Sequence, residues 1–185
     1  MSIYLDYNAS APIDERVLEK MVSVYKSTFG NADSRTHDFG EGARQVVETA
    51  RGQVANLLGV SNSEVFFTSG STESSNIAIQ GLLEYARETG KRHVITSAIE
   101  HKAVLETVKY LEKEGFAIDI VAPENDGRVS VEKIVELLRE DTLLVSLMHA
   151  NNETGIIQPV NELGEILNKK EILFHIDATQ SCGKL

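Results

Sequence analysis

Short apolar segments alternate with helical patterns along most of the chain, and this alternation constrains the fold more than any other feature of the sequence. The apolar segments are strand candidates at residues 64–68, 93–96, 116–121, 143–147 and 172–176. Apolar residues recur at helical spacing from Pro12 onward, again up to Gly59, from the residues after 68 to about Glu88, and around 104–111, 131–138 and 161–167. Near-continuous apolar strands separated by helices predict an α/β fold, with a mostly parallel sheet flanked by helices.

Charge and composition exclude several classes of protein. The net charge of −10 argues against a nucleic-acid binder or a protein of anionic membrane surfaces, because both need clustered Lys and Arg. No apolar run approaches the roughly 20 residues that span a bilayer, and the first residues lack the pattern of a signal peptide. A single cysteine, Cys182, excludes an intrachain disulfide and fits a reducing compartment. These features predict a cytoplasmic protein.

Ligands of such sheets bind beyond the carboxyl ends of the strands, so the residues after each strand are the candidates for chemistry. Ser71 and Thr72 follow the first strand candidate in a Gly-containing turn that leads into a helix. Free N–H groups and hydroxyl donors at a helix start suit a phosphate. Ser and Thr are also the favoured helix N-caps, so the turn alone leaves both readings open.

The next two strand ends carry a ring and two amides. His101 lies where the second strand gives way to a helix, so it could stack on a planar cofactor or simply cap the helix. Asn151 and Asn152 follow the fourth strand. They could form a turn or donate hydrogen bonds to a ligand oxygen, and the sequence alone does not decide between these roles.

Asp177 follows the last strand, where a buried carboxylate is costly unless it is paired. A protonated pyridine nitrogen is a fitting partner, and a helix N-cap is the alternative. A phosphate cradle, a ring, amides and a carboxylate together fit pyridoxal phosphate better than a dinucleotide. No G-x-G-x-x-G motif follows the first strand, which also counts against a dinucleotide site.

The same segments resemble those of the NifS/IscS-type cysteine desulfurases, which belong to the class V aminotransferase group. The matching segments follow one another in family order at residues 4–12, 29–37, 68–76, 100–104, 149–155 and 175–180. The resemblance implies the amino-terminal part of the large domain of a fold-type I pyridoxal-phosphate enzyme. It also implies an amino-terminal arm and first-helix start at residues 1–15, followed by a partial cofactor-binding domain at residues 16–185.

The resemblance assigns roles residue by residue, with no metal site. Ser71 and Thr72 match the family's phosphate-binding pair, and His101 matches the histidine that stacks on the pyridine ring and is assigned acid–base work.

The remaining matches concern the ring's edge. Asn152 matches the asparagine near the substrate and the phenolic oxygen, and Gln180 matches the glutamine that hydrogen-bonds to that oxygen. Asp177 matches the aspartate on the pyridine nitrogen.

Two family residues are not matched in this chain. The lysine that holds the cofactor as a Schiff base, and the cysteine that accepts the sulfur, belong to later family segments. Lys184 does not match that lysine, and Cys182 replaces an ordinary apolar position, so we expect it to be a small buried residue. The chain is therefore expected to be a truncated fragment that is inactive alone.

The complete family enzyme would convert L-cysteine to L-alanine and an enzyme persulfide. The implied partners are L-cysteine, a sulfur-acceptor or iron–sulfur scaffold protein, and a second copy in a homodimer, with no nucleic acid or membrane. The sulfur would serve iron–sulfur cluster or other thio-cofactor synthesis. Two alternatives stay open: a non-catalytic truncated paralogue with a binding or structural role, and a fragment of another fold-type I enzyme such as a selenocysteine lyase.

Overall fold

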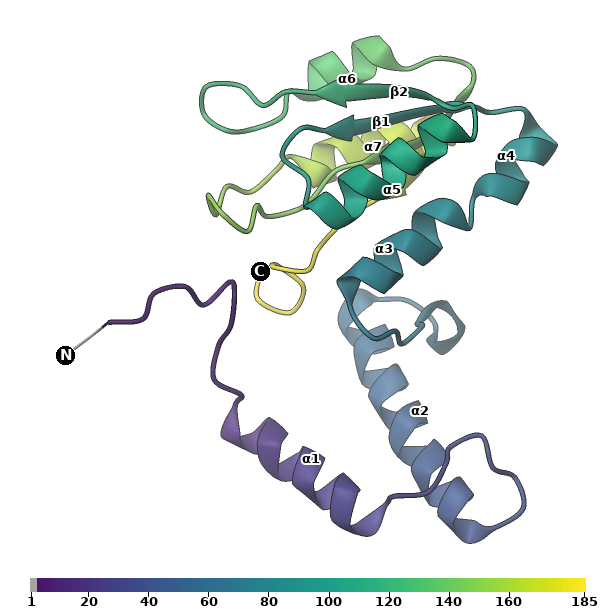
Figure 1. Ribbon diagram of the computed structural model, residues 1–185, viewed down its shortest axis with the longest axis vertical. Coiled ribbons are helices and arrows are strands. Elements are labelled where there is room, and N and C mark those ends of the chain that lie inside the picture. Colours follow the sequence, from purple (N-terminus) through teal and green to yellow (C-terminus); the bar gives the residue numbers. More distant parts are fainter. Residues whose placement is uncertain (1–2) are drawn as a thin grey trace. The chain divides into compact units, whose positions relative to one another are not determined.

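A computed structural model describes residues 3–185, which form two compact units that meet in the chain at Phe67 and Thr68 (Figure 1). The first unit contains two α-helices and one 3₁₀ turn: α1 (Glu15–Ser27), α2 (Asp38–Leu58) and η1 (Asn62–Glu64). The second contains the remaining elements in the order α3 (Ser71–Gln80), α4 (Leu83–Thr89), β1 (His93–Ser97), α5 (Lys102–Lys113), β2 (Ala117–Val121), α6 (Val131–Leu137), β3 (Thr142–Ser146), α7 (Val160–Lys169) and β4 (Leu173–His175). No helix within 3–185 is long and apolar enough to cross a membrane.

The second unit is built on a four-stranded parallel sheet in the order β2-β1-β3-β4. All five residues of β1 and all five of β3 are buried, and their apolar residues, at 94–95 and 143–145, lie between polar residues that are buried at the strand ends. The expected α/β class with a mostly parallel sheet is thus confirmed. Because every strand runs the same way, the segments that follow the strands leave from one edge of the sheet.

Helices cover both faces of this sheet. Ile95 and Val145 pack with apolar residues of α6 and α7. Val94 and Leu144, their neighbours along the strands, pack with residues of α3, α4 and α5. Figure 1 shows α5 and α7 on opposite sides of β1. Successive strand residues point to opposite faces, so each strand contributes to two apolar layers.

At the amino-terminal end of the strands, a buried histidine joins three strands. The Nδ1 atom of His93 lies 2.8 Å from Thr142 Oγ1, and its Nε2 atom lies 3.0 Å from Asp119 Oδ2. Arg139 Nη2 also donates to Asp119 Oδ2 at 2.8 Å, and this bond is the main reason that the pKa of Asp119 is lowered. Burial lowers the pKa of His93. The neutral ring therefore accepts from Thr142 and donates to Asp119.

We expect this histidine to contribute substantially to stability. His93→Leu would leave the buried Thr142 hydroxyl and the Asp119 carboxylate each short of one partner, which should lower the free energy of unfolding by about 2–3 kcal/mol. Urea unfolding at pH 7.5 measures this. Lys109→Ala, which breaks an exposed ion pair with Glu106, should change it by less than about 0.5 kcal/mol. Equal losses in the two variants would contradict the assignment.

The strand predicted at residues 64–68 was wrong. The structure has the 3₁₀ turn η1 up to Glu64; Val65 has an extended backbone, and residues 65–68 belong to no strand. Within residues 3–185 no strand lies beside this segment, and Phe66 and Phe67 are 80% and 51% exposed. Arg51 instead donates to the Val65 carbonyl, and its guanidinium lies 5.1 Å from the centre of the Phe67 ring.

Two predicted helix boundaries also moved, whereas one held. The helix predicted to open at Pro12 begins at Glu15, because Asp14 is the N-cap and accepts from Arg16 N at 2.9 Å. The helix predicted up to about Glu88 is divided between α3 and α4 at Gly81. The predicted stop at Gly59 is confirmed, since that residue ends α2 with a left-handed φ of 67°.

Candidate cofactor site

Three segments that follow strands meet at the carboxyl edge of the sheet. They comprise residues 98–101 after β1, 147–155 after β3 and 176–181 after β4. The last two remain joined beyond their strands, because Leu147 N donates to His175 O at 3.0 Å and His149 N donates to Asp177 O at 2.9 Å. These two bonds hold the start of the segment after β3 beside the start of the segment after β4.

The start of α3 offers unpaired donors. Within residues 3–185, the backbone N–H groups of Ser71, Thr72 and Glu73 donate to no backbone acceptor, and the first helical bond runs from Ser74 N to Gly70 O at 3.0 Å. The space beside Gly70 is open, since a Cβ there would meet nothing within 4 Å. Free N–H groups, two exposed hydroxyls and open space are what a phosphate group needs.

The Glu73 carboxylate in the same turn is bonded to Ser69 and not to these donors. Its Oε2 accepts from both the backbone N and the Oγ of Ser69, each at 2.6 Å. These two bonds lower the pKa of Glu73. The acidic side chain is therefore held on the residue that precedes the turn.

His101 is the N-cap of α5 and is exposed at the rim of two hollows. Its Nδ1 accepts from Ala103 N at 3.2 Å, so this nitrogen caps the helix, which was one of the two roles predicted for His101. One hollow, of about 380 Å³ between α3 and α5, is also lined by Thr72. The other, of about 580 Å³, is also lined by Asn152. The structure thus brings two other predicted residues, Thr72 and Asn152, to hollows that both border His101.

The two adjacent asparagines have different environments. Asn151 is buried; its Nδ2 donates to Ile99 O at 3.1 Å, and its Oδ1 accepts from the backbone N atoms of Glu153 and Thr154 at 3.0 and 2.9 Å. It is therefore the turn former. Asn152 is half-exposed and lines the larger of the two hollows at His101.

Asp177 and Gln180 belong to one turn after β4. The Oδ1 atom of Asp177 accepts from Thr179 N at 3.0 Å and from Thr179 Oγ1 at 2.5 Å, so the carboxylate caps the turn, much as the N-cap alternative describes. Both Asp177 and Gln180 are half-buried. Cys182 is exposed in the same turn, and the expectation that it is buried was wrong, because Ser181 takes the inward position.

Glu100 is a buried acid that the sequence argument did not single out. Its Oε1 accepts from Ser97 Oγ at 2.6 Å and from Met148 N at 2.8 Å, whereas its Oε2 has no partner within residues 3–185. Burial raises the pKa of Glu100 to about 7, and the nearby charge of Asp177 adds to the rise. The signal was available: Glu100 follows a buried apolar strand, which was the ground for choosing Asp177.

This raised pKa predicts a pH-dependent stability. The folded chain holds the Glu100 proton more tightly than the unfolded chain, whose value is near 4.5, so the contribution is complete below pH 4.5 and is lost as the pH rises through 7. The loss amounts to about 3 kcal/mol. Glu100→Gln, which cannot ionise, should gain that much relative to the parent between pH 4.5 and 8.

Urea unfolding of both proteins across this pH range measures the difference. Burial lowers the pKa values of His93 and His175, but these groups titrate in parent and variant alike and cancel. Glu106→Gln, at an exposed position on α5, serves as the control. A constant difference between parent and Glu100→Gln would show that folding does not raise the pKa of Glu100.

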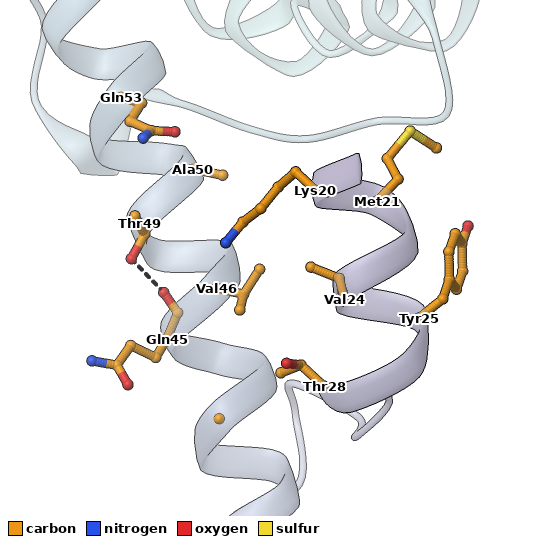
Figure 2. Close-up of a pocket in the computed structure, with 11 residues that line it drawn as sticks. Lys20, Met21, Val24, Tyr25, Thr28, Gln45, Val46, Thr49, Ala50 and Gln53 are labelled. Atoms are coloured by element: carbon orange, nitrogen blue, oxygen red, sulfur yellow. Dashed lines mark hydrogen bonds between the residues drawn. The ribbon is translucent and has the colours of Figure 1, made fainter. Parts of the chain in front are cut away.

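The first unit has its own hollow of about 780 Å³ between α1 and α2 (Figure 2). Its wall consists of apolar side chains such as Met21, Val24 and Val46, together with amides, hydroxyls and Lys20. It contains no carboxylate, histidine or cysteine. Within residues 3–185, no group of three or more His, Cys, Asp or Glu side chains could hold a metal ion. The chemistry is thus concentrated at the sheet edge.

Comparisons with known proteins agree on one family. The family model for aminotransferase class-V matches residues 3–185. Cysteine desulfurase IscS of Vibrio vulnificus (strain YJ016) is 49% identical over 187 residues, which cover 100% of this chain and 46% of the relative. A solved NifS-like protein matches with a TM-score of 0.94 at 48% identity, over 100% of this chain and 51% of that one. SspA in complex with cysteine matches with a TM-score of 0.91 at 39% identity, over 97% and 51%. The chain spans about half the length of these relatives.

Proposed function

The chain belongs to the aminotransferase class-V family, and from that membership we propose that it is the cofactor-binding part of a pyridoxal-phosphate-dependent cysteine desulfurase. The complete protein would convert L-cysteine to L-alanine and an enzyme-bound persulfide. One observation carries the proposal: His101 borders two hollows at the sheet edge, of which one is also lined by Thr72 and the other by Asn152, and the three residues come from separate sequence segments.

The residues present fit pyridoxal phosphate. The N–H groups and hydroxyls of Ser71 and Thr72 would hold the phosphate, in the open space beside Gly70. Asp177 would hold the protonated ring nitrogen, and Asn152 and Gln180 would bind the phenolic oxygen. When bound, the cofactor supplies an electron sink for loss of the α-proton of L-cysteine.

His101 would lie over the pyridine ring of the cofactor and transfer protons. Its Nδ1 accepts from Ala103 N, so in the neutral imidazole the proton sits on Nε2. Nε2 is then the atom from which a proton is given or to which one returns. A ring at the helix cap is well placed for both tasks, because its imidazole is exposed and its orientation is fixed.

The remaining parts of the proposal concern the longer protein. A lysine that carries the cofactor and a cysteine that accepts the sulfur would come from the part of the relatives that lies outside the match. The sulfur would pass to an acceptor or iron–sulfur scaffold protein in the cytoplasm, and the complete enzyme would be a homodimer. The division into an arm at residues 1–15 and a cofactor domain at residues 16–185 belongs to the same proposal.

Cofactor binding tests the assignment of Asp177. Pyridoxal phosphate titrated into the chain, followed by absorbance, should bind at least tenfold more weakly to Asp177→Ala, because a charge-assisted bond contributes about 1.5–3 kcal/mol. The matched control is Asp126→Ala, since Asp126 forms the same kind of turn bond, to Arg128 N at 3.0 Å. Loss of affinity in both variants, or in neither, would count against Asp177 as a cofactor ligand.

A chimera tests the reaction itself. Residues 1–185 would replace the matching part of the Vibrio vulnificus enzyme, with which they are 49% identical. We expect this chimera to release alanine and sulfide from L-cysteine in the presence of a reductant, whereas the 185-residue chain alone should not. His101→Ala in the chimera should reduce the rate by about 100-fold or more, and Lys109→Ala should leave it unchanged. A folded chimera that binds pyridoxal phosphate but does not turn over L-cysteine would contradict the proposed reaction.

A further inference from the structure

We propose that Glu100 and Asn151 are positioning residues that brace the loops carrying His101 and Asn152 against each other. The inference rests on the proposed function, since it concerns the same site. Each positioning residue immediately precedes a proposed cofactor contact, is buried, and bonds to the opposite loop. Neither is itself among the residues proposed to hold the cofactor.

The brace takes over where the backbone ladder ends. The pairing of β1 with β3 stops at Thr96 and Ser146, and the two strands then give way to loops. Immediately after this point, Glu100 Oε1 accepts from Met148 N at 2.8 Å, and Ser97 Oγ at 2.6 Å completes the contact. A side chain of the first loop thus bonds to the backbone of the second.

The second bond runs in the opposite sense. Asn151, in the loop after β3, donates from Nδ2 to Ile99 O at 3.1 Å. Its Oδ1 accepts from the backbone N atoms of Glu153 and Thr154, which shapes the turn around Asn152. A side chain of the second loop thus bonds to the backbone of the first, and the two bonds together form a closed cross-link.

The cross-link determines how His101 faces Asn152. Both residues line the same hollow of about 580 Å³, one from each loop. Without the brace, the loop after β1 would keep its bond from Ala98 N to Val121 O, and the loop after β3 would keep its bonds to the segment after β4, but the two bonds of the brace between these loops would be lost. A displacement of about 1 Å in such groups is enough to weaken catalysis by about 100-fold, so the precision of the cross-link matters.

The two side chains allow the brace to be removed selectively. Glu100→Gln keeps the carbonyl oxygen that accepts both bonds, and the atom it alters has no partner within residues 3–185. Glu100→Ala removes the acceptor. Asn151→Asp keeps the oxygen that shapes the turn but replaces the amide donor to Ile99 O. The controls are Glu112→Ala and Asn168→Asp, both at exposed helix positions.

The first measurement needs no cofactor. In the ¹⁵N-labelled chain, we expect the amide proton of Met148, which Glu100 Oε1 accepts, to exchange at least tenfold faster in Glu100→Ala than in the parent, and within twofold of the parent in Glu100→Gln. Asn151→Asp should move the signals of residues 99–101 while the turn amides of Glu153 and Thr154 stay protected. Should Glu100→Ala not fold, Asn151→Asp decides. Unchanged signals in the folded variants would overturn the brace.

The second measurement is a titration with pyridoxal phosphate. Affinity should fall at least tenfold in Glu100→Ala and Asn151→Asp, and stay within twofold of the parent in Glu100→Gln and both controls. Equal affinity in all variants would overturn the positioning role. If the parent itself does not bind the cofactor but the amide effects are present, the brace is supported and the proposed function fails, so the two failures are distinct.

Discussion

The parallel pairing of β1 with β3 is the constraint on which the rest of the second unit depends. The two strands are buried along their whole length and bond to each other and to β2 and β4. Since the strands run in the same direction, the helices that connect them form apolar layers on both faces of the sheet. The loops that follow the strands all leave from one edge of the sheet. Residues about fifty positions apart in the chain, such as His101 and Asn152, can therefore line one hollow.

Polar groups at the two ends of β1 show how one strand can serve two purposes. At its start, His93 is fully buried, but each ring nitrogen has a partner, so the group ties three strands together. Beyond the end of β1, Glu100 is nearly as buried as His93, but one of its carboxylate oxygens has no hydrogen-bond partner within residues 3–185. A buried polar group whose hydrogen bonds are all formed stabilises the scaffold. A buried carboxyl group that lacks a partner for one oxygen binds its proton more tightly, because its charged form is poorly stabilised.

Much of the fold was predictable because its signal is local. Four of the five apolar runs predicted as strands, and the left-handed stop at Gly59, were assigned correctly, because their signal lies in neighbouring residues. The segment after Glu64 failed because a strand exists only beside a partner, and the sequence pattern does not show whether one is present. The separate roles of Asn151 and Asn152 could not be predicted either, since they depend on Ile99, which is some fifty positions away in the chain. Glu100 was missed although the rule that selected Asp177 applies to it equally.

The exposed phenylalanines after η1 affect the handling of the protein in solution. Phe66 and Phe67 are adjacent and belong to no strand, so this segment is open to β-augmentation by another molecule, which is a common route to ordered aggregates. Arg51 occupies one backbone acceptor of this segment and places a fixed charge over Phe67. The Arg51 side chain therefore opposes strand pairing at this segment, because an approaching strand would have to displace its guanidinium before a regular ladder of backbone hydrogen bonds could form.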